Sequence, residues 1–249
     1  MKLELKEGQK LFFISDTHFA HNNICRATTK WDTRNDLTRD FKSLELMNQT
    51  IIERINAVVG EDDILFHLGD WSFGGIEQIW KFRKQIFCKN IHLILGNHDH
   101  HIEDNKILPG IYSDLYGNIQ EGDTPWKHGN NEYDLFGVES QSLFKSVNNY
   151  LKLDVVFPHL DKTQKRRKKS FILCHYPITS WHDMNQGNIH LFGHVHLPPK
   201  HKLREGKGLD VGWDGSGGVP YNVEDILRIM EHQPIKKITL PQDHHEKVI

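Results

Sequence analysis

The chain has 249 residues, of which 37% are hydrophobic and 26% charged, and its formal net charge is −2. This balance is typical of a soluble globular protein and gives no overall bias towards nucleic acid or a membrane. No apolar run approaches the roughly 18 residues that a membrane-spanning helix needs. The 18 histidines stand out, because histidine is above all a metal ligand and a proton carrier.

The N-terminal residues and the cysteines indicate a cellular compartment. The first ten residues, MKLELKEGQK, are charged and lack the apolar core of a signal peptide. Cys25, Cys88 and Cys174 are far apart and form no CxxC pair, so neither a disulfide framework nor a cysteine–zinc cluster is expected. We therefore expect a cytoplasmic protein, in a reducing environment.

Short apolar runs of strand length alternate with helical patterns along the chain. The five runs are LFFISD from Leu11, DILFHLGD from Asp63, IHLILGN from Ile91, SFILCHYP from Ser170 and IHLFGH from Ile189. Residues 40–59 carry apolar side chains at helical spacing, and a second helical pattern begins at Gly75. Strands that alternate with helices predict an α/β fold with right-handed crossovers.

The rest of the chain is less regular. Residues 100–152 are rich in Gly, Asn, Asp and Glu, and we interpret them as an insertion or lid within a single domain of residues 1–249. The pattern from Ser142 fits a helix or a strand, and the basic run DKTQKRRKKS from Asp161 predicts the tip of a hairpin. Beyond Gly208 we expect a strand, a glycine-rich turn and a short helix that begins near Asn222.

Each of the five predicted strands ends in side chains that bind metals. The carboxyl ends of strands in an open α/β sheet form the usual position of a site. Two carboxylates, an amide and several imidazoles would meet there, and together they suit manganese, iron, nickel or zinc. They are too many for one tetrahedral ion and about enough for two ions that share a carboxylate. In chain order these residues are Asp16 and His18, Asp70, Asn97 and His98, His175, and His194 and His196.

The motifs D-x-H, GD, GNHD, H and GHxH, each after an apolar strand and in this order, resemble the calcineurin-like metallophosphoesterase superfamily. The stretches SDTHFAHNNI, LELMNQTIIERIN and HLGDWSFG are most similar to its small bacterial and phage members. The resemblance covers residues 11–99 and 170–230. It implies four layers, in which two mixed β-sheets form a sandwich flanked by helices.

The resemblance also implies roles for individual residues. His98 would face the phosphate and assist the leaving group, with Asp99 behind it as an orienting partner. Asp70 would bridge two divalent ions, manganese being the first expectation and iron, nickel or zinc the alternatives. The remaining ligands would be Asp16, His18 and His196 for the first ion, and Asn97, His175 and His194 for the second.

A dinuclear-metal-dependent phosphoester hydrolase follows from these roles. A hydroxide shared by the two metals would attack phosphorus in line, and we predict a phosphodiesterase from the likeness to the small members. A phosphomonoesterase or a nuclease on the same site is the alternative. The alternative hypothesis of a different class is a non-catalytic binding module, which the complete set of metal ligands disfavours.

Four further polar or aromatic residues and one basic run are weaker candidates for contacts with the substrate. His21 and Asn22 either contact the substrate phosphate or form a polar loop. Trp181 and His182 either form a wall on which a planar group stacks or pack a loop over the core. The basic run Lys165–Lys169 could bind a nucleic-acid backbone, but a solvated hairpin tip is the preferred interpretation, because the overall charge is slightly negative.

Overall fold

One of the two main sheets has five strands. The computed structural model describes residues 1–31, 37–114, 118–122, 136–159 and 166–236. Four strands of this sheet are parallel and the edge strand β14 is antiparallel to β2. Across the sheet the strands are β14 (Tyr221–Asn222), β2 (Leu11–Ile14), β3 (Ile64–His67), β4 (Asn90–Ile94) and β8 (Ser146–Asn148).

The other main sheet has six strands and is mixed, and most of its strands come from the second half of the chain. β9 and β10 pair antiparallel, as do β12 and β13, whereas the other neighbours pair in parallel. The antiparallel pairing of β9 with β10 agrees with a hairpin, but Lys168–Ser170 of the basic run belong to β10, and residues 161–165 lie outside the described residues. Across the sheet the strands are β1 (Lys2–Glu4), β9 (Tyr150–Val156), β10 (Lys168–Cys174), β11 (Ile189–Phe192), β13 (Gly208–Asp210) and β12 (Leu203–Arg204).

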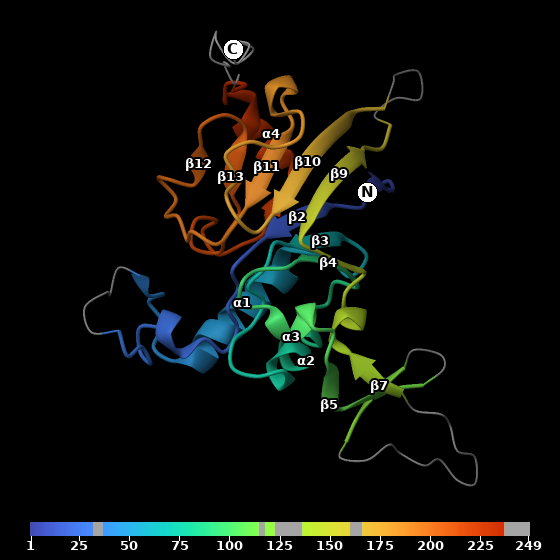
Figure 1. The fold of residues 1–249 in the computed structure, drawn as a ribbon, viewed down its shortest axis with the longest axis vertical. Helices are drawn as coiled ribbons and strands as arrows, with labels where there is room; N and C mark the ends of the chain where they lie inside the picture. The colour runs from blue at the N-terminus through green and yellow to red at the C-terminus, as the bar shows by residue number, and fades with distance from the viewer. Residues whose placement is uncertain (32–36, 115–117, 123–135, 160–165, 237–249) are drawn as a thin grey trace, which may run out of the picture.

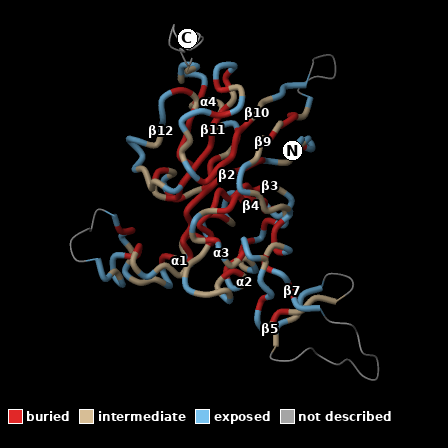
Figure 2. Tube along the Cα trace, viewed as in Figure 1, coloured by how far each residue is buried: buried red, intermediate tan, exposed pale blue. Residues whose placement is uncertain are grey.

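The two sheets pack against each other through one apolar core. Phe13 and Phe66 of the five-stranded sheet belong to the same buried cluster as Phe171 and Leu191 of the six-stranded sheet. The rings of Phe13 and Phe171 are 5.5 Å apart across the interface. Figure 2 shows that the central strands are buried along almost their whole length. The expected sandwich of mixed sheets is confirmed.

Helices cover the outer face of the five-stranded sheet. α1 (Leu44–Val58) begins at Ser43, whose side chain accepts a hydrogen bond from the backbone N–H of Leu46, and it falls within the predicted range 40–59. α2 (Glu77–Arg83) follows in the position of the second predicted helix. Ile51 and Ile55 of α1 and Phe82 of α2 are buried in a second apolar cluster, with Leu65 and Leu93 of the sheet.

The helix α4 (Val223–Glu231) begins where the sequence predicts it. Asn222 is its N-cap, and its side chain accepts a hydrogen bond from the backbone N–H of Glu224. Ile226 and Met230 of α4 are buried in the core between the sheets. Within the described ranges, no helix combines the length and the apolar character needed to span a membrane.

The predicted insertion at 100–152 is not one structural unit. It contains α3 (His100–Glu103) and a separate three-stranded sheet, which Figure 1 shows at the far side of α2 from the six-stranded sheet. The later part, β8 and β9, belongs to the two main sheets, because β8 pairs with β4 and β9 pairs with β10. The strands of the separate sheet are β6 (Ile119–Glu121), β5 (Ile107–Ser113) and β7 (Phe136–Glu139). Short 3-10 helices are found at Asn22–Ile24, Ser140–Leu143 and Met184–Gln186.

Candidate metal centre

All seven expected metal ligands lie beyond the carboxyl ends of five strands, β2, β3 and β4 of one sheet and β10 and β11 of the other. Six of them form two groups, and within each group the ligand atoms lie within 4.8 Å of one another. The groups are Asp16, His18 and His196, and Asp70, His175 and His194. The packing of the two sheets therefore assembles a cluster that neither sheet contains alone.

The first group has the spacing of donors that share an ion. Nε2 of His18 lies 3.1 Å from Nε2 of His196. Oδ1 of Asp16 is 3.6 Å from Nε2 of His196 and 3.8 Å from Nε2 of His18. Ligands bound at about 2.0–2.2 Å from one ion are roughly 3–3.5 Å apart, so the residues fit a divalent cation.

Asn97 lies next to the second group, and Asp70 connects that group to the first. Nε2 of His175 is 3.2 Å from Oδ1 of Asn97 and 3.4 Å from Oδ2 of Asp70. The same Oδ2 atom of Asp70 is 3.5 Å from Nε2 of His18 in the first group. Asp70 thus lies between the groups, where a carboxylate shared by two ions would be.

Hydrogen bonds on the far side of two imidazoles leave Nε2 available to an ion. Nδ1 of His175 donates to the carbonyl oxygen of Leu68 at 2.7 Å, and Nδ1 of His196 lies 2.7 Å from Oδ2 of Asp214. Such contacts select the imidazole tautomer and orient the ring. His18 differs, because its buried Nδ1 has no hydrogen-bond partner among the residues that the structure describes.

Arg39 and Asp214 were not recognised in the sequence, yet they support the first group. The buried guanidinium of Arg39 binds both carboxylate oxygens of Asp214, at 2.8 and 3.0 Å. It also donates to the backbone carbonyls of Asp16 at 2.6 Å and Thr17 at 2.8 Å. The two residues are 175 positions apart, so no local pattern could have paired them.

The backbone around the ligands is strained. Five of the seven expected ligands have a positive φ, a region that residues other than glycine rarely adopt. Such conformations persist where the surrounding structure imposes them, and they concentrate at functional sites. The five residues are Asp16 (58°), His18 (48°), Asp70 (56°), His194 (71°) and His196 (48°).

The ionisable groups of the centre strongly perturb one another. Burial raises the pKa of Asp16, whereas burial and the charge of Arg39 lower that of His18 well below its ordinary value. Burial also opposes the charged forms of Asp70 and His175. Their mutual hydrogen bond and the opposite charges around them together outweigh burial, which lowers the pKa of Asp70 and raises that of His175 to about 9. Without a cation His175 therefore holds a proton that a metal ion would displace.

His98 lies next to the centre, but Asp99 does not contact its ring. The ring centroid of His98 is 5.6 Å from that of His18, and its backbone N–H donates to Oδ1 of Asp70 at 3.0 Å. The carboxylate of Asp99 instead accepts the backbone N–H groups of Asp70, Trp71 and Gly96 at 2.8–2.9 Å. Asp99 thus holds the loops after β3 and β4 together, and burial raises its pKa to about 7.

Of the weaker candidates, His21 is close to the centre. Its ring lies 5.4 Å from that of His18 and stacks on Phe73 at 4.0 Å. Burial lowers the pKa of His21 to about 4, so it is neutral at pH 7. Asn22 is exposed, and its carbonyl oxygen accepts a hydrogen bond from Thr28.

Trp181 and His182 have other contacts. Trp181 is buried, donates from Nε1 to the carbonyl oxygen of Asn188 and lies 5.2 Å from the ring of His190. His182 is exposed next to Lys152 and Asp183. Among the described residues, none of their contacts is with an expected metal ligand. For Trp181 the structure favours the packing of a loop over the core.

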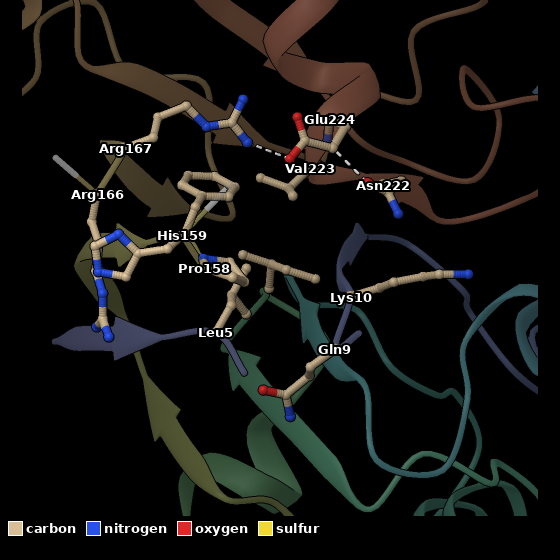
Figure 3. A pocket seen from close by; sticks show the side chains of 12 residues that line it. Leu5, Gln9, Lys10, Pro158, His159, Arg166, Arg167, Asn222, Val223 and Glu224 are labelled. Atoms are coloured by element: carbon tan, nitrogen blue, oxygen red, sulfur yellow. Dashed lines mark hydrogen bonds and ion pairs between the residues drawn. The ribbon is translucent and has the colours of Figure 1, made fainter. Parts of the chain in front are cut away.

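The basic run lies at the opposite ends of the strands. A cavity of about 700 Å³ opens there between β1, the β9–β10 hairpin and the start of α4 (Figure 3). Arg166 forms an ion pair with Glu4 at 3.1 Å, and Arg167 forms one with Glu224. Lys165 falls outside the described residues. The residues that line this cavity include neither of the two groups of ligand atoms.

Comparison with known proteins identifies a family. A family model described as calcineurin-like phosphoesterase matches residues 9–198. A curated relative, "Uncharacterized protein MJ1445" of Methanocaldococcus jannaschii, is 34% identical over 102 residues, which are 40% of this chain. The matched part spans about half of that relative, 52% of its length. A solved structure, that of the "Protein of Unknown Function AQ665" from Aquifex aeolicus, aligns with 89% of this chain and all of its own, at 17% identity and a TM-score of 0.49.

Proposed function

The chain belongs to the calcineurin-like phosphoesterase family, and from this premise we propose that it hydrolyses phosphodiesters at a dinuclear metal centre. The observation that carries the proposal is the pair of donor groups that share Asp70. Their spacing of 3.1–3.8 Å suits two cations, and every ligand expected from the sequence is present. A binding module would not need the complete set.

The residues of the metal centre have separate roles in the proposed reaction. Divalent cations bound by these residues would lower the pKa of water and neutralise the charge of a bound phosphate. Asp70 lies where it can hold both cations, while Asp214 and Leu68 orient two of the imidazole ligands. His98 lies at the edge of the centre, where its imidazole would donate a proton to the leaving oxygen.

The preference for diesters is inferred from the small members of the family that the chain resembles. A phosphomonoesterase or nuclease on the same site is the second candidate. We expect manganese as the cofactor, with iron, nickel and zinc as alternatives, because imidazole, carboxylate and amide ligands suit all four. The three cysteines are unpaired, and we propose a reducing compartment, the cytoplasm.

A substrate and metal panel tests the proposal. Purified protein is stripped with a chelator, reloaded with manganese, nickel or zinc, and offered bis(4-nitrophenyl) phosphate or 4-nitrophenyl phosphate. Turnover of the diester that disappears in Asp70→Asn supports the proposal. Turnover of the monoester alone favours the second candidate. No turnover with any of the metals, in protein shown to bind them, would favour the binding module.

A further inference from the structure

A small cavity lies next to His98, between the loop that follows β3 and the start of α3. Its volume is about 210 Å³. It is lined by Ser72, Phe73, Ile79, His98 and Ile102, by two glycines of the same loop, and by Asp99, His100 and His101. We call it the His98 cavity. Two chain segments supply most of this lining. Residues 72–75 follow the expected ligand Asp70 in sequence, and residues 98–102 follow the expected ligand Asn97.

His98 is the side chain that the cavity and the metal centre share. Its ring centroid lies 5.6 Å from that of His18 on one side and 4.7 Å from that of Phe73 on the other. Its backbone N–H is bound to Asp70 at 3.0 Å, which fixes the loop relative to both donor groups. A phosphate held by the two groups would therefore have one ester substituent directed past His98 towards the cavity.

The walls suit a neutral, flat substituent. Phe73, Ile79 and Ile102 are apolar, and burying apolar surface against them is favourable. The carboxylate of Asp99 also borders the cavity, but backbone N–H groups of Asp70, Trp71 and Gly96 already occupy it. An ammonium would find no free carboxylate among the lining residues, whereas a ring can pack on Phe73.

The volume limits the size of the group. Cavities that enclose drug-sized molecules measure about 300–1,000 Å³. The His98 cavity is smaller at about 210 Å³, so it has room for one ring system and not for an entire dinucleotide.

We propose that the His98 cavity receives the leaving group of the substrate, and that this leaving group is an alcohol that carries one neutral ring, as a nucleoside does. The inference rests on the proposed function, because it requires His98 to act at the leaving oxygen. In the reaction, water supplies the oxygen that forms the new bond to phosphorus. The phosphorus–oxygen bond to the ring-bearing alcohol breaks, and that alcohol departs with a proton delivered through His98.

The identity of the products tests this proposal in the wild-type protein. Two mixed phosphodiesters join thymidine to a base-free deoxyribose analogue, one through the 5′ oxygen of thymidine and the other through its 3′ oxygen. With manganese bound, we expect both to release free thymidine and to leave the phosphate on the base-free sugar. Cleavage that follows the 3′ or 5′ position regardless of the base would overturn the proposal.

The failure of the two proposals can be told apart. If bis(4-nitrophenyl) phosphate is hydrolysed but neither mixed diester is, the proposed function stands and the leaving-group assignment falls. If no diester is hydrolysed, the phosphodiesterase proposal itself fails and the inference fails with it.

A substitution that narrows the cavity gives an independent test. Ser72→Leu should raise KM for bis(4-nitrophenyl) phosphate about tenfold, with a smaller change in kcat and unchanged metal content. Thr179→Leu introduces the same side chain in a loop at a different cavity and should leave both constants unchanged. Wild-type KM in a folded Ser72→Leu protein would mean that the cavity is a packing void. The product test stands even if this variant does not fold.

Discussion

His98 connects the metal centre with the loop that carries Phe73, and its ring contributes no atom to either donor group. We therefore expect His98→Ala to bind both metals as the wild type does and to lose about 10²–10⁴-fold in kcat, the usual contribution of a general acid. Steady-state rates and metal content measured on the same sample check this. The exposed His201 provides the control His201→Ala, which should keep full activity. Wild-type rates in His98→Ala would refute the role.

Arg39 acts on the first donor group through Asp214 and through the backbone of Asp16. Arg39→Met leaves Asp214 without its cation and the ring of His196 poorly oriented, so we expect a loss of about 10–100-fold in metal affinity. Arg39→Lys keeps the charge but cannot form the bidentate contact with Asp214. Its metal affinity should therefore lie between that of Arg39→Met and that of the wild type. Metal competition titration of protein shown to be folded by circular dichroism measures the effect.

The control for this series is Arg26→Met. Arg26 forms an ion pair with Asp40 on the surface, where the side chain of Arg26 is 41% exposed and that of Asp40 is 79% exposed. Its loss should leave metal affinity unchanged. Equal affinity in Arg39→Met and wild type would show that Arg39 only stabilises the fold.

At the scale of elements, the turn after β3 brings two loops of the centre together. Gly69 has φ of 98°, and a Cβ atom there would lie 2.6 Å from the backbone nitrogen of Gly96. Gly8 also has positive φ, 78°, but nothing lies within 4 Å of its Cβ position. Gly8→Ala should therefore cost only the left-handed strain, about 1–2 kcal/mol.

Gly69→Ala should destabilise the protein more than Gly8→Ala and should also reduce metal content, because the loops after β3 and β4 must separate. Urea unfolding and metal analysis of the two variants measure the difference. Equal losses of stability with full metal content in both would contradict this account of the turn.

His190 in β11 makes the stability of the six-stranded sheet sensitive to pH. Burial lowers its pKa to about 4, while its Nδ1 donates to the carbonyl of Ile172 and its Nε2 accepts from Ile178. In the unfolded chain its pKa is about 6.5, so between pH 6.5 and 4 the unfolded state binds the additional proton. Stability therefore rises with pH in this window and is lost as the pH falls.

Urea unfolding at pH 7.5 and pH 5 tests this contribution. We expect His190 to account for about 2 kcal/mol of the stability that the wild type loses between the two pH values. In His190→Gln that loss should be smaller by this amount, although the variant itself is less stable at pH 7.5. An identical loss in both proteins would show that His190 does not carry the effect. Metal-free protein is used for both, so that changes at the ligands cancel.

At the scale of the whole molecule, the metal centre joins the two sheets. Asp70 and Asn97 follow strands of the five-stranded sheet, and His175 and His194 follow strands of the six-stranded sheet. An ion at a hundred times its dissociation constant adds about 2.7 kcal/mol of stability. For a chain of this size we expect manganese to raise Tm by about 5–10 °C over the chelated protein.

Thermal unfolding followed by circular dichroism measures this shift. Asp70→Asn, which removes the carboxylate between the donor groups, should show little or none of it. A Tm that is the same with manganese and with chelator would mean that the two sheets do not depend on a shared metal centre.

Much of the fold and of the candidate site could be predicted from local patterns. The five core strands and the helices α1, α2 and α4 lie where the sequence pattern predicts them, whereas the pattern over β9 fitted either a helix or a strand. The ligand residues could be recognised because each directly follows a strand, and parallel strands end at a common edge. The mixed-sheet sandwich that the resemblance implies is confirmed as well.

Contacts between distant segments were decided by the tertiary structure alone. Asp99 follows His98 in sequence and was expected to orient it, but its carboxylate accepts backbone N–H groups of its own loop and of the loop after β3. Nothing local relates Arg39 to Asp214, or assigns β8 and β9 to the main sheets and β5–β7 to a sheet of their own. The spacing of apolar and ligand residues is a property of a few neighbouring positions. The partner of a buried charge and the sheet that a strand joins depend on how the whole core packs.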